Sequence, residues 1–163
     1  QYNCVTPLDE ENALKEITQE IALLALSRRE FFQIAEFHGG TALRILYGLQ
    51  RFSEDLDFAL LVPDVSFNLA PYLRELADEF REFGYEIEIL DGSIGKILQL
   101  NFPLHKRNPK KIQIKLEVDV NPPKGATTEI KYLDFPLSYG VLAKDLPSSF
   151  SGKLHALLCR NYL

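Results

Sequence analysis

Apolar and polar residues follow one another along this chain with two periods, one typical of helices and one typical of strands. Thr6 and Pro7 offer the chemistry of a helix start, and apolar side chains follow them at helical spacing. A second helical pattern lies between Pro71 and Gly84, which mark its start and its end. In all, we expect helices over residues 7 to 28 or 29, 30–34, 41–47, 71–83 and 146–163.

Strict alternation identifies the strands. It is clearest over residues 111–120, where every second side chain is apolar. We expect Asp91 and Gly92 to form a turn between two other strands. The expected strands cover residues 36–38, 55–61, 85–90, 94–102 and 111–120.

This order of elements predicts an α+β or mixed α/β fold with one central sheet flanked by helices. The 163 residues suffice for a single domain with a hydrophobic core, which we expect to span residues 1–163. The chain has no initiating Met and stops within its last helical pattern. We therefore expect it to be part of a longer protein.

Composition and charge narrow the function classes. The net charge of -5 argues against broad, non-specific binding of nucleic acid. It permits a nucleotide substrate, because a bound metal brings its own positive charge. Residues 106–115 form a basic stretch, which is either a solvated loop or a contact for an RNA backbone.

The cellular setting is also constrained. No apolar run is long enough to cross a membrane, and the N-terminal segment lacks the pattern of a secretory leader. Cys4 and Cys159 lie at opposite ends of the chain and form no metal-binding pattern. We expect a reducing, cytoplasmic setting and no membrane partner.

A tight turn at Gly39 and Gly40 joins a predicted strand to a predicted helix. Two glycines let the backbone turn sharply and approach a ligand closely. The free N–H groups at the start of the helix would then point at an anion, helped by the helix dipole. Taken alone, two such glycines are more often a plain turn. The neighbouring His38 could line the site, but we expect it to pack or to form a hydrogen bond.

Asp55 and Asp57 lie on one face of a single predicted strand, because alternate side chains share a face. Two carboxylates this close repel each other, and a divalent cation relieves that repulsion. Hard oxygen ligands of this type suit Mg²⁺ or Mn²⁺. The alternative is the solvent-facing side of an edge strand.

Glu117 and Asp119 share a face of the strand over residues 111–120. Beside the first pair, one of them would complete a site of three carboxylates, which can hold two metal ions. The alternative is a solvated face, which also carries Gln113 and Lys115.

Together these motifs resemble the nucleotidyltransferase superfamily that includes DNA polymerase β, whose signature is Gly-Gly or Gly-Ser, a helix, and then Asp-x-Asp on a strand. The chain is more similar still to the AbiEii/AbiGii-like toxin family of bacterial toxin–antitoxin systems. Proteins of that family usually continue into a helical C-terminal domain, so the resemblance implies that this chain is truncated at its C-terminus. The similar segments cover most of the chain and comprise residues 37–44, 51–58, 115–119, 121–123 and 150–158.

The resemblance implies a role for each candidate residue. Asp55 and Asp57 would bind metal, and either Glu117 or Asp119 would be the third carboxylate. The implied nucleotide-binding residues are Gly39, Gly40 and Thr41 for the phosphates, Ser53 beside the turn or the triphosphate, and Lys153 for the phosphates or the nucleotide. The alternative for Lys153 is a solvated helix residue.

We therefore expect a metal-dependent nucleotidyltransferase that moves NMP from an NTP to an acceptor and releases pyrophosphate. The resemblance suggests RNA, tRNA or a protein side chain as the acceptor, and a cognate antitoxin as a partner. One alternative is a catalytically inactive nucleotide-binding or assembly module of the same fold. Another is a phosphohydrolase or nuclease that uses the same acidic residues.

Overall fold

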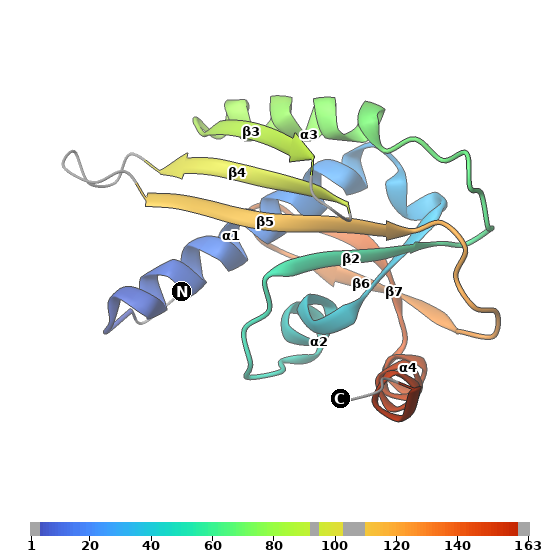
Figure 1. The fold of residues 1–163 in the computed structure, drawn as a ribbon. Helices are drawn as coiled ribbons and strands as arrows, with labels where there is room; N and C mark the ends of the chain where they lie inside the picture. Colours follow the sequence, from blue (N-terminus) through green and yellow to red (C-terminus); the bar gives the residue numbers. More distant parts are fainter. Residues whose placement is uncertain (1–3, 92–94, 103–109, 160–163) are drawn as a thin grey trace.

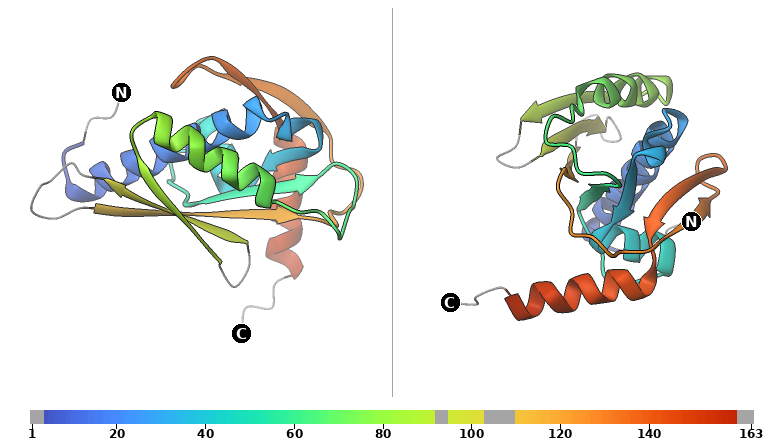
Figure 2. Two further views of the ribbon diagram at one scale, coloured as in Figure 1. Left: turned by 90° about the horizontal axis from the view of Figure 1, so that it is seen from above. Right: turned by 90° about the vertical axis from the view of Figure 1, so that its right-hand side faces the viewer.

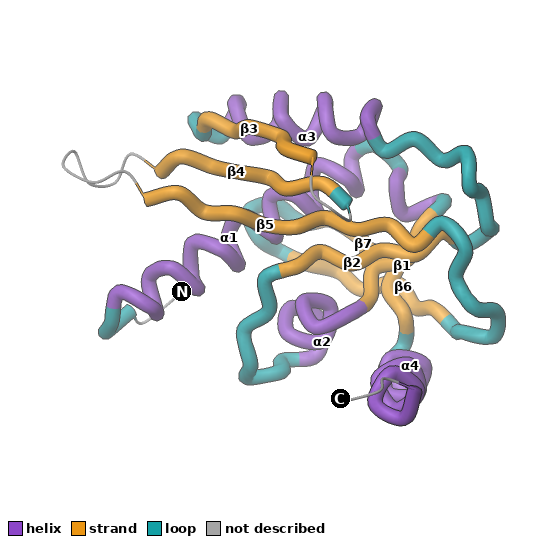
Figure 3. The backbone as a smooth tube through the Cα atoms, in the orientation of Figure 1, coloured by secondary structure: helices purple, strands orange, loops and turns teal. Residues whose placement is uncertain are grey.

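A mixed seven-stranded sheet forms the centre of the computed structural model, which describes residues 4–91, 95–102 and 110–159. The strand order is β3-β4-β5-β2-β1-β7-β6 (Figures 1 and 3). Pairing is parallel between β1 and β7 and between β2 and β5, and antiparallel between the other neighbours. The strands are β1 (Ala35–His38), β2 (Asp55–Leu60), β3 (Glu86–Asp91), β4 (Lys96–Phe102), β5 (Lys110–Asp119), β6 (Thr128–Leu133) and β7 (Tyr139–Lys144).

Two helices lie side by side against one face of this sheet (Figure 2). One of them, α1, contacts β5 and β7, and the other, α3, contacts β3. A third helix, α2, joins β1 to β2 and packs against both strands, whereas α4 extends away from the sheet (Figure 2). The helices are α1 (Pro7–Arg28), the short 3-10 helix η1 (Phe31–Gln33), α2 (Gly39–Tyr47), α3 (Ala70–Glu82) and α4 (Leu146–Cys159).

Helix α1 shows how local sequence and burial act together. It begins with a capping box, in which the Asp9 N–H donates to the Thr6 hydroxyl at 3.2 Å and the Thr6 N–H donates to the Asp9 carboxylate at 2.8 Å. Further along, residues 21–26 are buried all round the helix, because the sheet covers one side and α3 another. Among the described residues, no helix has both the length and the apolar character needed to cross a lipid bilayer.

The core lies beneath the strands that carry the candidate residues. Phe58 on β2 contacts the rings of Phe31 and Phe37, with ring centres 5.1 and 5.4 Å apart. On β5, Ile112, Ile114 and Leu116 are fully buried. The buried faces of β2 and β5 hold these strands in register, so their opposite faces present the carboxylates at fixed positions.

The predicted α+β class and single central sheet are confirmed, and so are the predicted helices and strands before residue 126. The predicted turn is wrong at Asp91, because Asp91 is the last residue of β3 and pairs with Lys96. Helix α2 begins at Gly39, two residues earlier than predicted, because the turn glycines belong to its first turn. We predicted no element over residues 126–145, although Tyr139, Val141 and Ala143 alternate as the buried face of β7. The prediction at Gly92 lies outside the described residues. So do residue 94 of the strand predicted over 94–102, residues 106–109 of the basic stretch and residues 160–163 of the last predicted helix.

Candidate functional site

Gly39 and Asp57 meet at the point where β1 turns into α2. Gly39 has a φ of +84°, a region that favours glycine, and a side chain there would overlap the Asp57 carboxylate. His38 pairs with Asp57 across the antiparallel strands, which brings the carboxylate to this place. The N-cap residue of α2, His38, makes no capping hydrogen bond through its side chain. The Asp57 carboxylate therefore lies against the N-terminal turn of a helix that no side chain caps at this position.

The next two residues of the turn contact other parts of the site. A side chain on Gly40 would place its Cβ 2.6 Å from the Ser53 hydroxyl, so Ser53 fills the space beside this glycine. Thr41 is fully buried, and its hydroxyl donates to the carbonyl oxygen of Asp55. The Thr41 side chain thus connects α2 to β2 through a hydrogen bond. Only the backbone of Thr41 can therefore contact a ligand.

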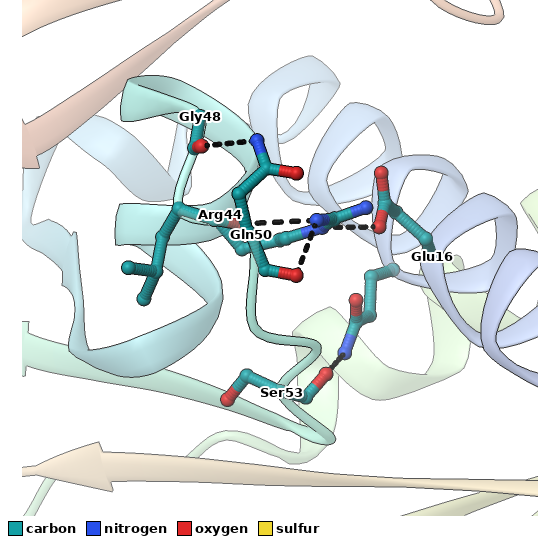
Figure 4. A network of polar contacts seen from close by, with 7 residues as sticks. Glu16, Arg44, Gly48, Gln50 and Ser53 are labelled. Atoms are coloured by element: carbon teal, nitrogen blue, oxygen red, sulfur yellow. Dashed lines mark hydrogen bonds and ion pairs between the residues drawn. The ribbon is translucent and has the colours of Figure 1, made fainter.

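A polar network holds the loop between α2 and β2 in place (Figure 4). Its centre is Arg44, whose guanidinium pairs with Glu16 at 2.8 Å and donates to the carbonyls of Leu49 and Gln50, each at 3.1 Å. The same guanidinium lies 4.0 Å from the ring centre of Phe52. The loop leads directly to Ser53 and Asp55, so Arg44 acts on the site by positioning it.

Parallel pairing of β2 with β5 sets the positions of the remaining carboxylates. Glu117 lies directly beside Asp57, and Lys115 lies beside Asp55. Asp119 lies farther along, beside Ala59, and its exposed carboxylate accepts the N–H of Asn121 at 2.9 Å. Register therefore places Glu117 closer to the aspartate pair than Asp119.

The Glu117 carboxylate forms an ion pair with Lys115 on the same face of β5. Within the described part of the chain, no group of three or more His, Cys, Asp or Glu side chains is arranged to hold a metal ion. The donor set still fits a hard divalent cation in kind and in strand position, because Asp55, Asp57 and Glu117 supply carboxylates from neighbouring positions. Glu117 would have to leave Lys115 to join the two aspartates.

Burial and mutual repulsion shift the pKa values of the site. Burial raises the pKa of Asp57 to about 6, and the nearby charges of Asp55 and Glu117 add to the effect. The pKa of Asp55 is also raised, chiefly by burial. Burial lowers the pKa of His38 to about 4, helped by the charge of Lys144, so this imidazole is neutral at pH 7. An extra positive charge near the aspartates would be stabilising.

Positive charge comes from two lysines that line a cleft of about 340 Å³. These are Lys144 at the end of β7 and Lys153 on α4, and Asp57 and Asp119 line the same cleft. The cleft is completed by residues from four segments, namely His38, Gly39, Ala59, Pro122, Pro123, Ser148, Ser149 and Gly152. It places carboxylates, a helix start and two ammonium groups around one space, as an anionic ligand with a cation requires.

A second cleft of about 400 Å³ shares His38, Asp57 and Asp119 with the first. Glu117 and Gly95 line it as well, and its described lining contains no lysine or arginine. Asp57 thus lines two clefts. The first contains two lysines, and the described lining of the second contains none.

The structure brings most of the predicted residues together. Asp57, Asp119, Gly39 and Lys153 line the first cleft, and Glu117 lines the second. The other predicted residues lie around the turn and on β2 without lining the first cleft, namely Gly40, Thr41, Ser53 and Asp55. Lys144 was missed, because its strand was not predicted; the alternation over residues 139–143 was the available signal.

Comparison with known protein families gives one match. A family described as "Nucleotidyl transferase AbiEii toxin, Type IV TA system" matches residues 21–163. These residues contain every side chain that lines the two clefts. A search of curated proteins finds no match.

Solved structures with a similar fold include JHP933 from Helicobacter pylori, with a TM-score of 0.57 and 19% identity. An antigenic nucleotidyltransferase-like protein from Paracoccidioides brasiliensis has a TM-score of 0.57 and 17% identity. Each likeness covers 90% of this chain, but only 57% of JHP933 and 68% of the fungal protein. At these identities the likeness establishes the fold, and the chain spans less than two thirds of JHP933.

The contact between Gly39 and Asp57 predicts unequal effects of two glycine substitutions. Gly48, the C-cap of α2, also has a positive φ, +74°, but nothing lies within 4 Å of a side chain there. We expect Gly48→Ala to lower the free energy of unfolding by about 1–2 kcal/mol, the cost of the backbone conformation alone. Gly39→Ala should cost about 1–3 kcal/mol more, because it must also displace Asp57. Urea unfolding measures both, and equal losses would show that Asp57 does not fill this space.

The raised pKa of Asp57 predicts a stability difference that depends on pH. Because the folded pKa is about 6 and the ordinary value is 3.8, the proton binds more tightly in the folded state. The stability this provides is fully present below about pH 3.8 and is lost as the pH rises through 6. In EDTA at pH 8, Asp57→Asn should therefore be more stable than wild type by about 1–2 kcal/mol, allowing for screening by water. Thermal unfolding should show this gain shrinking toward pH 4, and a gain independent of pH would contradict the assignment.

Proposed function

The chain belongs to the family of AbiEii nucleotidyltransferase toxins, and on that basis we propose that it transfers NMP from an NTP to an acceptor and releases pyrophosphate. One observation supports this most strongly. The Asp57 carboxylate lies against the start of α2 and lines one cleft together with Lys153 and Lys144. A triphosphate with its metal ion needs carboxylates for the metal and donors for the phosphates, and this cleft offers both.

We assign the metal site to Asp55, Asp57 and Glu117, with Mg²⁺ or Mn²⁺ as the ion. Register supports Glu117 as the third carboxylate, because it lies directly beside Asp57. Asp119 lines both clefts and would act at the edge of the site. When bound, the ion supplies positive charge that neutralises the phosphates and activates the attacking oxygen.

The chain's own residues would position the substrate. The backbone of Gly39, Gly40 and Thr41 at the start of α2 would receive the phosphates, and Lys153, which lines the same cleft as Gly39, would contact them. Ser53 supports the turn beside Gly40. The Gln19 side chain holds Ser53 by donating to its carbonyl at 2.9 Å.

The reaction replaces one phosphorus–oxygen bond with another. The oxygen of an acceptor hydroxyl bonds to the α-phosphorus and gives up its proton to water, while the bond from that phosphorus to the bridging oxygen breaks and pyrophosphate leaves with the bonding electrons. The second cleft, which Asp57 also lines, is the space that we propose for the acceptor. We propose RNA, especially tRNA, or a protein side chain as the acceptor, in the cytoplasm, and a cognate antitoxin as the partner of the whole protein.

A second candidate is a nucleotide-binding module without catalysis. The ion pair between Lys115 and Glu117 favours it, because it occupies the third carboxylate. In that case the protein would bind NTP without turning it over, so substituting Asp57 would have no effect on turnover.

A transfer assay tests the proposed function. Full-length protein, Mg²⁺ and total cellular RNA are incubated with each α-labelled NTP in turn, and label on RNA and on protein is measured. We expect Asp55→Ala and Asp57→Ala to lower transfer about 100-fold or more, because both remove charge stabilisation at the reacting phosphate. Chelation by EDTA should abolish transfer.

Matched controls make this assay specific. Asp134→Ala removes an exposed carboxylate that lines neither cleft, and it should leave transfer unchanged. Glu117→Gln should reduce transfer more than Asp119→Asn if register identifies the third carboxylate. Release of inorganic phosphate instead of pyrophosphate would indicate a phosphohydrolase, and NTP binding without any transfer would indicate the binding module.

A further inference from the structure

Lys144 is the last residue of β7, and its side chain lies on the wall of the first cleft. Its ammonium nitrogen is 3.1 Å from the Glu36 carboxylate on β1. Both side chains are largely buried, with 15% of Lys144 and 7% of Glu36 exposed. The charge of Lys144 also helps to lower the pKa of His38, which lines the same cleft. A lysine is thus held at a fixed point of the candidate nucleotide site.

The pairing with Glu36 leaves Lys144 able to bind a ligand. An ammonium group has three N–H donors. Glu36 is the partner of Lys144 in the ion pair, and Lys144 also lines the same cleft as Asp57. Anchoring by a buried carboxylate reduces the conformational freedom that a long side chain would lose on binding.

Two backbone N–H groups at the start of α4 already have hydrogen-bond acceptors. The Ser148 N–H in the first turn of α4 donates to the Asp145 carboxylate at 2.8 Å, and the Ser149 N–H donates to the Asp145 carbonyl at 2.9 Å. The start of α4 is therefore capped by its own chain. Among the described residues that line this cleft, the positively charged side chains are those of Lys144 and Lys153.

We propose that Lys144 binds the β- and γ-phosphates of the NTP, together with Lys153, and stabilises the pyrophosphate that leaves. This inference rests on the proposed function and extends it to a residue on β7. The charge of Lys144 offsets the negative charge that grows on the bridging oxygen as the bond to the α-phosphorus breaks. The alternative role is a purely structural ion pair with Glu36.

Binding of inorganic pyrophosphate separates the two roles. Isothermal titration calorimetry with the full-length protein and Mg²⁺ gives its Kd without any turnover. We expect Lys144→Met to raise this Kd about tenfold or more, because a charge-assisted hydrogen bond to phosphate is lost. The matched control Lys124→Met removes the same charge from an exposed position that lines neither cleft, and it should change the Kd little.

A double variant protects the test against misfolding. Lys144→Met leaves Glu36 buried without a partner, whereas Glu36→Gln with Lys144→Met removes both charges together. If the double variant melts like wild type but binds pyrophosphate about tenfold more weakly, the inference holds. An unchanged Kd in that variant would show that the pair is only structural.

The same preparations keep the two proposals distinguishable. Transfer by wild type together with an unchanged pyrophosphate Kd in the Lys144 variants overturns the role of Lys144 and leaves the proposed function standing. Absence of transfer despite pyrophosphate binding that depends on Lys144 overturns the proposed function and supports the phosphate site. Wild type that binds no pyrophosphate overturns the role of Lys144, whatever its activity.

Discussion

The contact between the Asp57 carboxylate and Gly39 is the constraint on which the rest of the site depends. It exists because β1 and β2 pair with His38 opposite Asp57, and because residue 39 has no side chain. The same contact puts a carboxylate against the first turn of α2, whose N–H groups favour anions. A cation between that carboxylate and a phosphate would satisfy both groups. Strand register, a glycine turn and a helix start thus combine at the place where we propose that a triphosphate binds with its metal.

Repulsion among the carboxylates of this site lowers the stability of the folded protein when no ligand is bound. Asp55, Asp57 and Glu117 repel one another on two paired strands, and burial raises the pKa of Asp57 to about 6. Lys115 relieves part of that repulsion through its ion pair with Glu117. The opposite faces of the same strands carry Phe58 and Leu116, which are almost fully buried. Apolar packing on one face offsets the repulsion on the other, so the fold can keep a cluster of carboxylates.

Sequence patterns predicted the parts of the fold that depend on strong periodicity. The alternation over residues 111–120 and the glycine turn predicted β5 and the joint between β1 and α2. Two features depended on tertiary pairing and were not predictable in the same way. The edge hairpin β6–β7 gave only short patterns on either side of Pro136, and its omission hid Lys144. The spacing of Glu117 and Asp119 alone could not rank them, because only the pairing of β5 with β2 decides which lies beside Asp57.

Crystals of the full-length protein grown with Mn²⁺ and a non-hydrolysable NTP analogue would test the central claim most directly. The account predicts an anomalous diffraction peak between the carboxylates of Asp55 and Asp57, with the phosphates at the start of α2. It also predicts that Glu117 turns from Lys115 toward the metal. An analogue bound elsewhere, with no peak at Asp57 and the Lys115–Glu117 ion pair intact, would contradict it.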